Sequence, residues 1–303
     1  MEFPARPWPT GTAEALEPLV RRVLAPNPSA FTFTGTQTYL VGAGNAVAVI
    51  DPGPDEPRHL AALEAALGGA KVAAIVCTHT HRDHSPAAAP LAAHSGAPVI
   101  GCAPLMLSDS GPRADAAFDP AYAPDRVLAD GESLSGPDWT LTAVATPGHT
   151  SNHLCYALAE SGALFTGDHV MGWSTTVVAP PDGDMAAYMQ SLEKLHARAD
   201  RVYYPAHGPQ VTRPRQLTRG LIGHRRQRER QIRNLLEAGP QPVAALVPRM
   251  YKGVDTALWP AAGRSVLAHL IDLERRGLVA RDGELWMAKV PARATDGMDA
   301  ASA

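Results

Sequence analysis

The chain has few of the residues and segments that mark secreted, fibrous or membrane proteins. Its 303 residues include three cysteines, Cys77, Cys102 and Cys155. Their odd number and wide spacing argue against a disulfide framework and favour reduced, buried thiols. The start of the chain lacks a signal-peptide pattern and no apolar run reaches membrane-spanning length, so we predict a cytoplasmic location and no membrane partner.

The charge balance gives no reason to expect a strongly charged partner. A formal net charge of -3 provides no global attraction to nucleic acids or acidic lipid surfaces. Hydrophobic residues make up 45% of the chain and charged residues 19%, which is ordinary for a globular protein. The length suits one large domain, or a medium domain followed by a small one.

Short strands and helices alternate through the first two thirds of the sequence. Residues 1–30 are rich in proline and are expected to wrap the surface. Short β-like runs then follow at 31–35, 38–42 and 46–51, with an amphipathic helix at 56–68. Ser85 and Pro86 predict an N-cap and first turn, so a helix should run to about His94.

Four polar side chains follow a buried-strand pattern at 72–78. The stretch CTHTHRDHSP places His79, His81, Asp83 and His84 within six residues. His79 and His81 are two residues apart, so on an extended segment they point the same way. One metal ion can take this pair and a second ion the pair that follows. The cluster therefore predicts a metal site in a strand-to-helix loop, where α/β folds place their chemistry.

Three later strand ends supply further ligands. A divalent metal ion needs four to six ligands, so two short pairs are too few. Predicted strands at 139–146, 163–167 and 202–205 lead to His149, Asp168 and His207. Asp168 can bridge two ions because a carboxylate has two oxygens.

These motifs resemble those of the metallo-β-lactamase-fold hydrolases. HTHRDH matches the HxHxDH signature, VIDPG precedes it, and TPGHTSNH, LFTGDH and YPAHG follow in the expected order over roughly residues 30–212. The resemblance implies an α/β fold, a four-layer αββα sandwich that holds two metal ions. The implied ligands are His79, His81 and His149 for one ion, Asp83, His84 and His207 for the other, and Asp168 between them.

The ligand set predicts the cofactor and the reaction. Nitrogen and oxygen ligands without a thiolate suit zinc, with iron or manganese as alternatives. Two close divalent cations lower the pKa of a shared water and produce a bridging hydroxide near neutral pH. That hydroxide attacks an acyl carbon or a phosphorus. Asp83 is the candidate catalytic residue, because it can help to orient the water besides acting as a ligand.

Three further residues are expected to support the ligands from behind. Asp51, at the end of the VIDPG strand, orders a turn or orients a ligand. His153 and His169 flank ligands, and each either supports the site or simply packs. The remaining histidines in helical stretches have no partner motif and are expected to be structural.

The last third of the chain changes in character. We predict a hydrolase domain at 1–212, a small helical, winged-helix-like domain at 213–292 and a disordered tail at 293–303. A long charged helix, two shorter helices and a hairpin around Asp282 resemble the β-lactamase-like-protein-2 group, which carries a C-terminal domain of this kind. The best-known member of that group is an endoribonuclease that acts on single-stranded RNA.

Four arginines on the long charged helix are candidate substrate contacts. Arg226 and Arg230 lie on one basic stripe at helical spacing, whereas Arg225 and Arg228 share an arc with apolar residues. The first pair either binds an anionic substrate or forms a solvated charged face. The second pair either meets buried carboxylates or points into a cleft toward an anion.

Three hypotheses for the function follow. The first is a phosphodiesterase on single-stranded RNA. The second is a hydrolase of a small ester or thioester, like glyoxalase II, although the glutathione-binding region of that family is missing. The third is a nucleic-acid-binding protein with a structural metal site, which seven ligands for two ions argue against. Asp168 is typical of the hydrolase branches and disfavours a lactamase proper, and a homodimer is expected as the commonest closed assembly.

Overall fold

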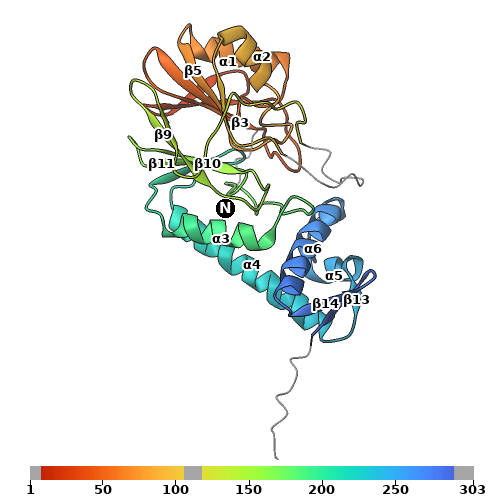
Figure 1. Cartoon of the computed structure of the whole chain (residues 1–303). Helices are drawn as coiled ribbons and strands as arrows, with labels where there is room; N and C mark the ends of the chain where they lie inside the picture. The colour runs from red at the N-terminus through yellow and green to blue at the C-terminus, as the bar shows by residue number, and fades with distance from the viewer. Residues whose placement is uncertain (1–7, 106–117, 290–303) are drawn as a thin grey trace, which may run out of the picture. The chain divides into compact units, whose positions relative to one another are not determined.

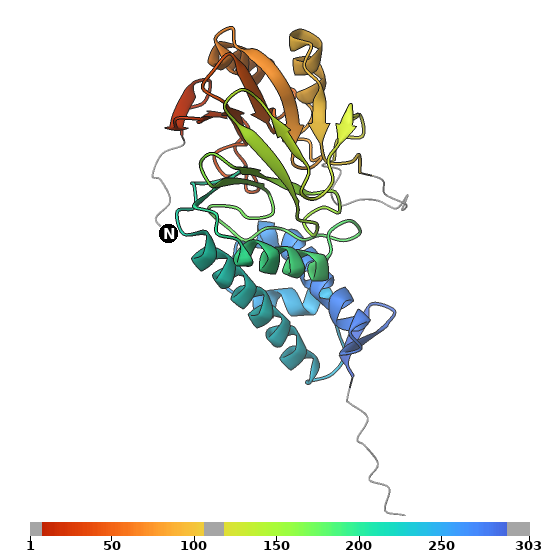
Figure 2. The same cartoon turned by 60° about the vertical axis from the view of Figure 1, so that its left-hand side comes forward.

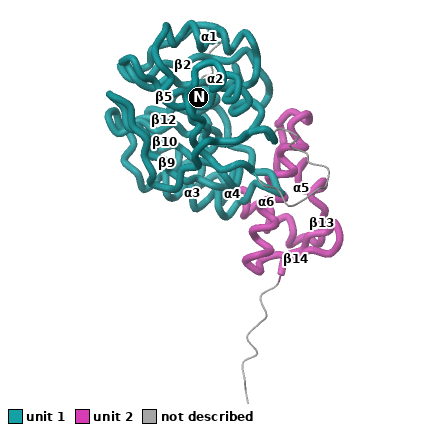
Figure 3. Tube along the Cα trace, turned by 45° about the horizontal axis from the view of Figure 1, so that its top comes forward, with its two compact units in different colours: residues 1–226 teal, residues 227–303 magenta. Residues whose placement is uncertain are grey.

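The computed structural model describes residues 8–105 and 118–289 of the chain. Contacts divide the chain into two compact units, residues 1–226 and 227–303, which Figure 3 colours separately. Each unit has its own β-structure and its own hydrophobic core. The tail predicted at 293–303 lies outside the described residues.

Two mixed β-sheets form the centre of the first unit (Figure 1). The seven-stranded sheet consists, in spatial order, of β1 (Ala13–Glu17), β2 (Val20–Leu24), β3 (Gln37–Val41), β4 (Ala46–Ile50), β5 (Lys71–Cys77), β6 (Val99–Gly101) and β7 (Arg126–Val127). The five-stranded sheet consists, in spatial order, of β12 (Val202–Pro205), β11 (Ala163–Gly167), β10 (Leu154–Leu158), β9 (Thr140–Ala145) and β8 (Ser133–Ser135).

Helices cover the outer faces of both sheets. The helices are α1 (Pro57–Leu67) and α2 (Ala88–Ser95) on the seven-stranded sheet, and α3 (Met185–Ala197) with the start of α4 (Pro214–Leu236) on the other side. Tyr203 of β12 donates a hydrogen bond to the Leu195 carbonyl of α3 at 3.3 Å. His196 of α3 contacts Thr218 of α4 at 3.0 Å. Figures 1 and 2 show this layering, and the predicted four-layer sandwich is confirmed.

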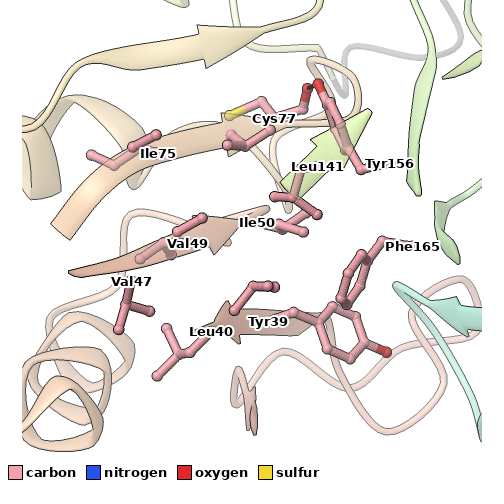
Figure 4. Close-up of a cluster of buried hydrophobic side chains, with 14 of the residues drawn as sticks. Tyr39, Leu40, Val47, Val49, Ile50, Ile75, Cys77, Leu141, Tyr156 and Phe165 are labelled. Atoms are coloured by element: carbon pink, nitrogen blue, oxygen red, sulfur yellow. Dashed lines mark hydrogen bonds between the residues drawn. The ribbon is translucent and has the colours of Figure 1, made fainter. Parts of the chain in front are cut away.

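Side chains from both sheets meet in the core between them (Figure 4). The ring of Tyr39 on β3 packs against that of Phe165 on β11, with centroids 5.0 Å apart. Ile50 is 1% exposed, and Tyr156 is fully buried. The Tyr156 hydroxyl donates to the Cys77 carbonyl on the opposite sheet at 2.7 Å. This bond satisfies a polar group inside the core and ties β10 to β5.

Residues 8–36 differ from their predicted structure, and residues 1–7 lie outside the described residues. Strands β1 and β2 form where a surface wrap was expected, because β2 pairs with β3 along its whole length and buries Val23 and Leu24. The run at 31–35, predicted as β-like, is a turn. Phe33 has φ of 59° and Gly35 has φ of 134°, and neither value belongs to a strand. Both predictions were therefore wrong.

The sequence predicted the ends of α1 correctly but not the N-cap of α2. Helix α1 has proline in its first turn and ends at Gly68, whose φ of 59° forms the left-handed cap that glycine allows, as predicted for 56–68. Helix α2 begins at Ala88, with Ala87 as its cap. The Ser85 hydroxyl instead donates to the Asp119 carboxylate at 2.9 Å, so the predicted N-cap was wrong.

The strand pairing brings distant polar residues to one edge of the sandwich. Strands β4 and β5 pair in parallel, so Asp51 and His79 follow neighbouring strand ends. Strands β11 and β12 also pair in parallel, and they lead to Asp168 and His207. Strand β10 pairs antiparallel with β11, which places the preceding β9–β10 connection, with His149, at the same edge. The candidate ligands gather because carboxyl ends of parallel strands share an edge.

The second unit is a small helical domain with a hairpin. Its elements are α5 (Val243–Met250), the 3₁₀ helix η1 (Thr256–Leu258), α6 (Trp259–Arg275), β13 (Gln241–Pro242), β14 (Val279–Asp282) and β15 (Leu285–Ala288), with the strands in the order β13-β15-β14. Trp286 and Leu270 lie in its core. The units divide between Arg226 and Gln227, within α4, whereas the sequence analysis placed the boundary at residue 212. No helix in the described part of the chain is both long and apolar enough for a membrane span.

Gly101 offers a test of the contact between the sheets. A Cβ at this position, where φ is 151°, would lie 2.6 Å from the Cys77 carbonyl oxygen and 2.9 Å from the Tyr156 hydroxyl. We predict that Gly101→Ala lowers the free energy of unfolding by about 2–4 kcal/mol, because an unfavourable φ and overpacking both cost stability. Gly96→Ala is the matched control, with φ of 70° and no atom within 4 Å, and should cost about 1 kcal/mol. Equal losses in urea denaturation would contradict the prediction.

Candidate metal centre

Three histidine nitrogens and one carboxylate converge from the segments that follow β5, β9 and β11. His79 Nε2 lies 2.9 Å from His81 Nδ1, which lies 3.1 Å from His149 Nε2. The Oδ2 atom of Asp168 is 3.6 Å from His149 Nε2. His79 and Asp168 are buried, and the other two are half-buried. These four residues form a first group of potential ligands.

A second group lies beside the first and shares Asp168 with it. Asp83 Oδ2 is 3.3 Å from His84 Nε2 and 3.2 Å from His207 Nε2. The Oδ1 atom of Asp168 is 3.2 Å from His207 Nε2 and 3.6 Å from His84 Nε2. Asp168 thus presents one oxygen to each group, which is the geometry of a bridging carboxylate. The structure therefore brings together all seven residues that the sequence analysis proposed as ligands.

The two groups have the spacing and chemistry that divalent ions require. Ligand atoms about 2.1 Å from a tetrahedral ion lie about 3.4 Å from one another. The shortest contacts within the groups run from 2.9 to 3.6 Å. Among the described residues, His84 Nε2 and Asp168 Oδ1 are buried without a hydrogen-bond partner. Buried polar atoms are rarely left without a partner, and a cation on these lone pairs is a fitting one.

The two carboxylates and the imidazoles shift one another's pKa values. Burial lowers the pKa of His81 to about 3, and the neighbouring His149 adds to this. Burial also opposes a charge on His207, but Asp168 and Asp83 outweigh it and raise the pKa to about 10. Burial by itself would raise the pKa values of the Asp83 and Asp168 carboxyl groups. The facing imidazoles outweigh burial and hold both pKa values well below the usual range. The site therefore holds two anions that attract cations, either protons or metal ions.

A buried carboxylate at the end of β4 orients one ligand of each group. Asp51 is 1% exposed and accepts hydrogen bonds from the Thr78 N–H, the Thr78 hydroxyl and His84 Nδ1, at 2.7, 2.8 and 3.0 Å. Because the Thr78 hydroxyl gives its proton to Asp51, it accepts one from His79 Nδ1 at 3.0 Å. Both imidazoles thus carry a proton on Nδ1 and present the Nε2 lone pair to the ligand groups. These are the contacts expected of the supporting role predicted for Asp51.

Backbone carbonyls orient two more candidate ligands. The Val177 carbonyl accepts a hydrogen bond from His149 Nδ1 at 2.7 Å, and the Gly35 carbonyl accepts one from His207 Nδ1 at 3.3 Å. In both cases Nε2 is left to face the group. The sequence analysis missed these partners because every residue has a carbonyl, and no motif tells which one faces a histidine.

The two histidines predicted to support the site make different contacts. His153 Nε2 accepts a hydrogen bond from the Asp168 N–H at 3.3 Å, and its Nδ1 donates to the Thr146 hydroxyl at 2.9 Å. It therefore holds the backbone of the bridging residue. His169 packs against Tyr188 with ring centroids 4.8 Å apart, and its ring nitrogens have no hydrogen-bond partner among the described residues. Its contacts are those of a packed ring.

The four candidate arginines do not form one free surface. Arg225 is 3% exposed and donates to the Thr176 carbonyl, where the sequence analysis expected a buried carboxylate or an anion in a cleft. Arg226 is exposed and pairs with Glu193 at 3.0 Å. Arg228 donates to a backbone carbonyl at 2.7 Å and covers a tyrosine ring. Arg230 is exposed.

Comparison with known families identifies the class of protein that this fold and site define. Residues 31–207 match the metallo-beta-lactamase superfamily, and residues 243–286 match the beta-lactamase associated winged helix domain. The first match covers more than half of the chain, so the protein belongs to the metallo-beta-lactamase superfamily. It is a metal-dependent hydrolase that carries a C-terminal winged-helix domain, and both predictions are confirmed.

Individual relatives add detail to this assignment. The chain is 34% identical over 224 residues to an atrochrysone carboxyl ACP thioesterase of Aspergillus fumigatus, covering 72% of this chain and 65%, slightly under two thirds, of that protein. It is 33% identical over 275 residues to a beta-lactamase-like protein 2 homolog of Drosophila melanogaster, covering 85% and 88%. A beta-lactamase domain protein from Burkholderia ambifaria has the same fold, with a TM-score of 0.80, 22% identity and 95% coverage of both chains.

Metal removal should destabilise the protein. We predict two divalent ions per chain and a lower Tm after chelation, because the buried carboxylates lose the cations that compensate them. A ligand at 100 times its Kd stabilises the folded state by about 2.7 kcal/mol. Elemental analysis and thermal melts at graded zinc concentrations measure both quantities. The double variant His81→Ala/Asp83→Ala, with one change in each group, should not respond to zinc. A parent protein whose Tm ignores chelation would sink the two-ion assignment.

Asp51 provides a test of ligand orientation. In Asp51→Asn an amide NH₂ replaces one of the oxygens that accept from Thr78 and His84. We predict that the affinity for both ions falls about 10–100-fold, as changes behind metal ligands usually do. Chelator competition measures this affinity. The matched control is Asp138→Asn, because Asp138 also accepts backbone N–H bonds, at 2.9 and 3.0 Å, from two residues of the β3–β4 turn. The idea fails if Asp51→Asn binds both ions as tightly as this control does.

Proposed function

We propose that the protein hydrolyses acyl thioesters with two bound divalent ions, zinc being the expected metal. One observation carries the proposal: a ligand set for two ions occurs in a hydrolase fold whose relatives include proteins named as thioesterases. The nitrogen and oxygen ligands suit zinc, with iron or manganese as alternatives.

The chain's own residues prepare the site for attack on a carbonyl. Bound divalent ions supply a Lewis acid and lower the pKa of water. The side chain of Asp83 is 26% exposed, against 12% for Asp168, so an entering water meets Asp83 first. The Thr36 hydroxyl donates to Asp83 Oδ2 at 2.9 Å and holds the carboxylate in place. Asp83 is therefore the residue placed to orient the water by accepting a hydrogen bond from it, besides acting as a ligand.

The arginine contacts favour a small substrate over RNA. Binding of single-stranded RNA depends on cations that are free to meet phosphates. Of the four candidate arginines, Arg225 is buried, Arg226 is paired with Glu193 and Arg228 is engaged by a backbone carbonyl. A substrate with one acyl group and a thiol leaving group needs no such stripe.

Cleavage of single-stranded RNA is the second candidate function. The match of residues 243–286 to a winged helix domain favours it, because such domains can bind nucleic acid. The exposed Arg226 and Arg230 would then meet the phosphates. The predicted homodimer is compatible with either function and stays a prediction.

A parallel assay distinguishes the two functions. Zinc- or manganese-loaded protein is incubated with N-acetylcysteamine thioesters and, separately, with end-labelled single-stranded RNA. We predict thiol release by the parent and a loss of at least about 100-fold in His81→Ala, because metal stabilisation is worth several kcal/mol. His94→Ala is the control, since that side chain is 68% exposed on α2. RNA cleavage without thiol release, abolished by Arg226→Glu/Arg230→Glu, would replace the thioesterase proposal with the nuclease.

A further inference from the structure

Arg225 is a charged side chain inside the first unit whose burial needs an explanation. It belongs to α4, is 3% exposed and donates a hydrogen bond to the Thr176 carbonyl. Its guanidinium also lies over the Tyr188 ring, 5.1 Å from the centroid. Burying a guanidinium is costly unless other contacts compensate the lost water, and the Thr176 carbonyl and the Tyr188 ring are such contacts.

The carbonyl that Arg225 holds belongs to the connection between two candidate ligands. The Thr176 hydroxyl donates to the carbonyls of Asp168 and His169, at 2.7 and 3.1 Å. The next residue, Val177, offers the carbonyl that accepts from His149 Nδ1 at 2.7 Å. Thr176 and Val177 therefore join the bridging carboxylate to the imidazole that shares its group.

Tyr188 closes the same network from α3. Its hydroxyl donates to the His169 carbonyl at 3.2 Å, while its ring lies under Arg225. The guanidinium is thus placed between a ring of α3 and the 172–178 segment. A planar cation suits this position because it can lie over a ring and donate to a carbonyl at the same time.

We propose that Arg225 is a positioning residue for the metal centre, which acts through Thr176 and Val177 on His149 and Asp168. It fixes the 172–178 segment so that the Val177 carbonyl holds the proton on His149 Nδ1 and leaves Nε2 for the ion. The larger effect falls on the ion bound by His79, His81 and His149, because His149 belongs to that ion alone and Asp168 is shared. The ion on His84 and His207 has separate supports, in Asp51 and the Gly35 carbonyl. This role differs from the substrate contact that the sequence analysis considered, and it holds for any ester or phosphodiester substrate.

Site-resolved metal affinity tests the proposal. The variants are Arg225→Met, which keeps length and helix propensity without charge, Arg225→Lys, which retains one donor, and Thr176→Val, which removes the hydroxyl. The control is Arg219→Met, an exposed arginine on the same helix. Zinc binding to the full-length protein is measured by competition with a chromophoric chelator, and the Tm of the metal-free protein is measured alongside.

We expect Arg225→Met and Thr176→Val to bind the ion on His79, His81 and His149 about 10–100-fold more weakly, with a smaller loss at the second ion, which shares only Asp168 with it. Arg225→Lys should recover part of this loss, because an ammonium can still donate to the Thr176 carbonyl. Arg219→Met should match the parent. If Arg225→Met does not fold, Thr176→Val and Arg225→Lys carry the same test.

Two results would overturn the proposal. One is unchanged affinity for both ions in Thr176→Val and in every folded Arg225 variant. The other is an equal loss at both ions that follows the fall in metal-free Tm, since that is the behaviour of a residue that only stabilises the fold. Both readouts are independent of turnover, so they do not depend on the thioesterase proposal.

Discussion

Burial of the Asp51 carboxylate is the constraint on which the metal centre depends. A carboxyl group that is 1% exposed is stable only if hydrogen bonds replace those it would make to water. The donors here are Thr78 and His84, which follow the neighbouring strand. The hydrogen bonds to Asp51 therefore compensate for its lost water and join the end of β4 to the loop after β5. They also set the proton position on His84 directly and on His79 through Thr78.

Hydrogen bonds with other partners orient further candidate ligands in the same way. His149 and His207 are held by backbone carbonyls, and the Asp168 N–H is held by His153. The candidate ligands follow strand ends, while several of the groups that orient them belong to the connections after β2 and β11. These connections therefore help to decide how the candidate ligands present their lone pairs to an ion.

Sequence patterns predicted which His and Asp residues would lie together better than they predicted the first strands. The HTHRDH cluster and the later strand ends are local motifs, so their spacing could be read directly. Strand β2 forms because β3 is available beside it, and that partner lies more than a dozen residues away. The Ser85 hydroxyl meets Asp119 for a similar reason, since a carboxylate brought close by folding outcompetes a local cap.

Arg225 shows most clearly where sequence reasoning ends. Its position on a charged helix predicted either a carboxylate partner or a cleft, and the structure provides the Thr176 carbonyl. The sequence by itself determined the hydrolase class, the C-terminal winged-helix domain and the residues that converge at the candidate metal centre, because these depend on residue chemistry at short, readable spacings. Only the tertiary structure decided which carbonyls and hydroxyls orient those ligands. Backbone groups are the same at every residue, and packing alone selects which of them face the site.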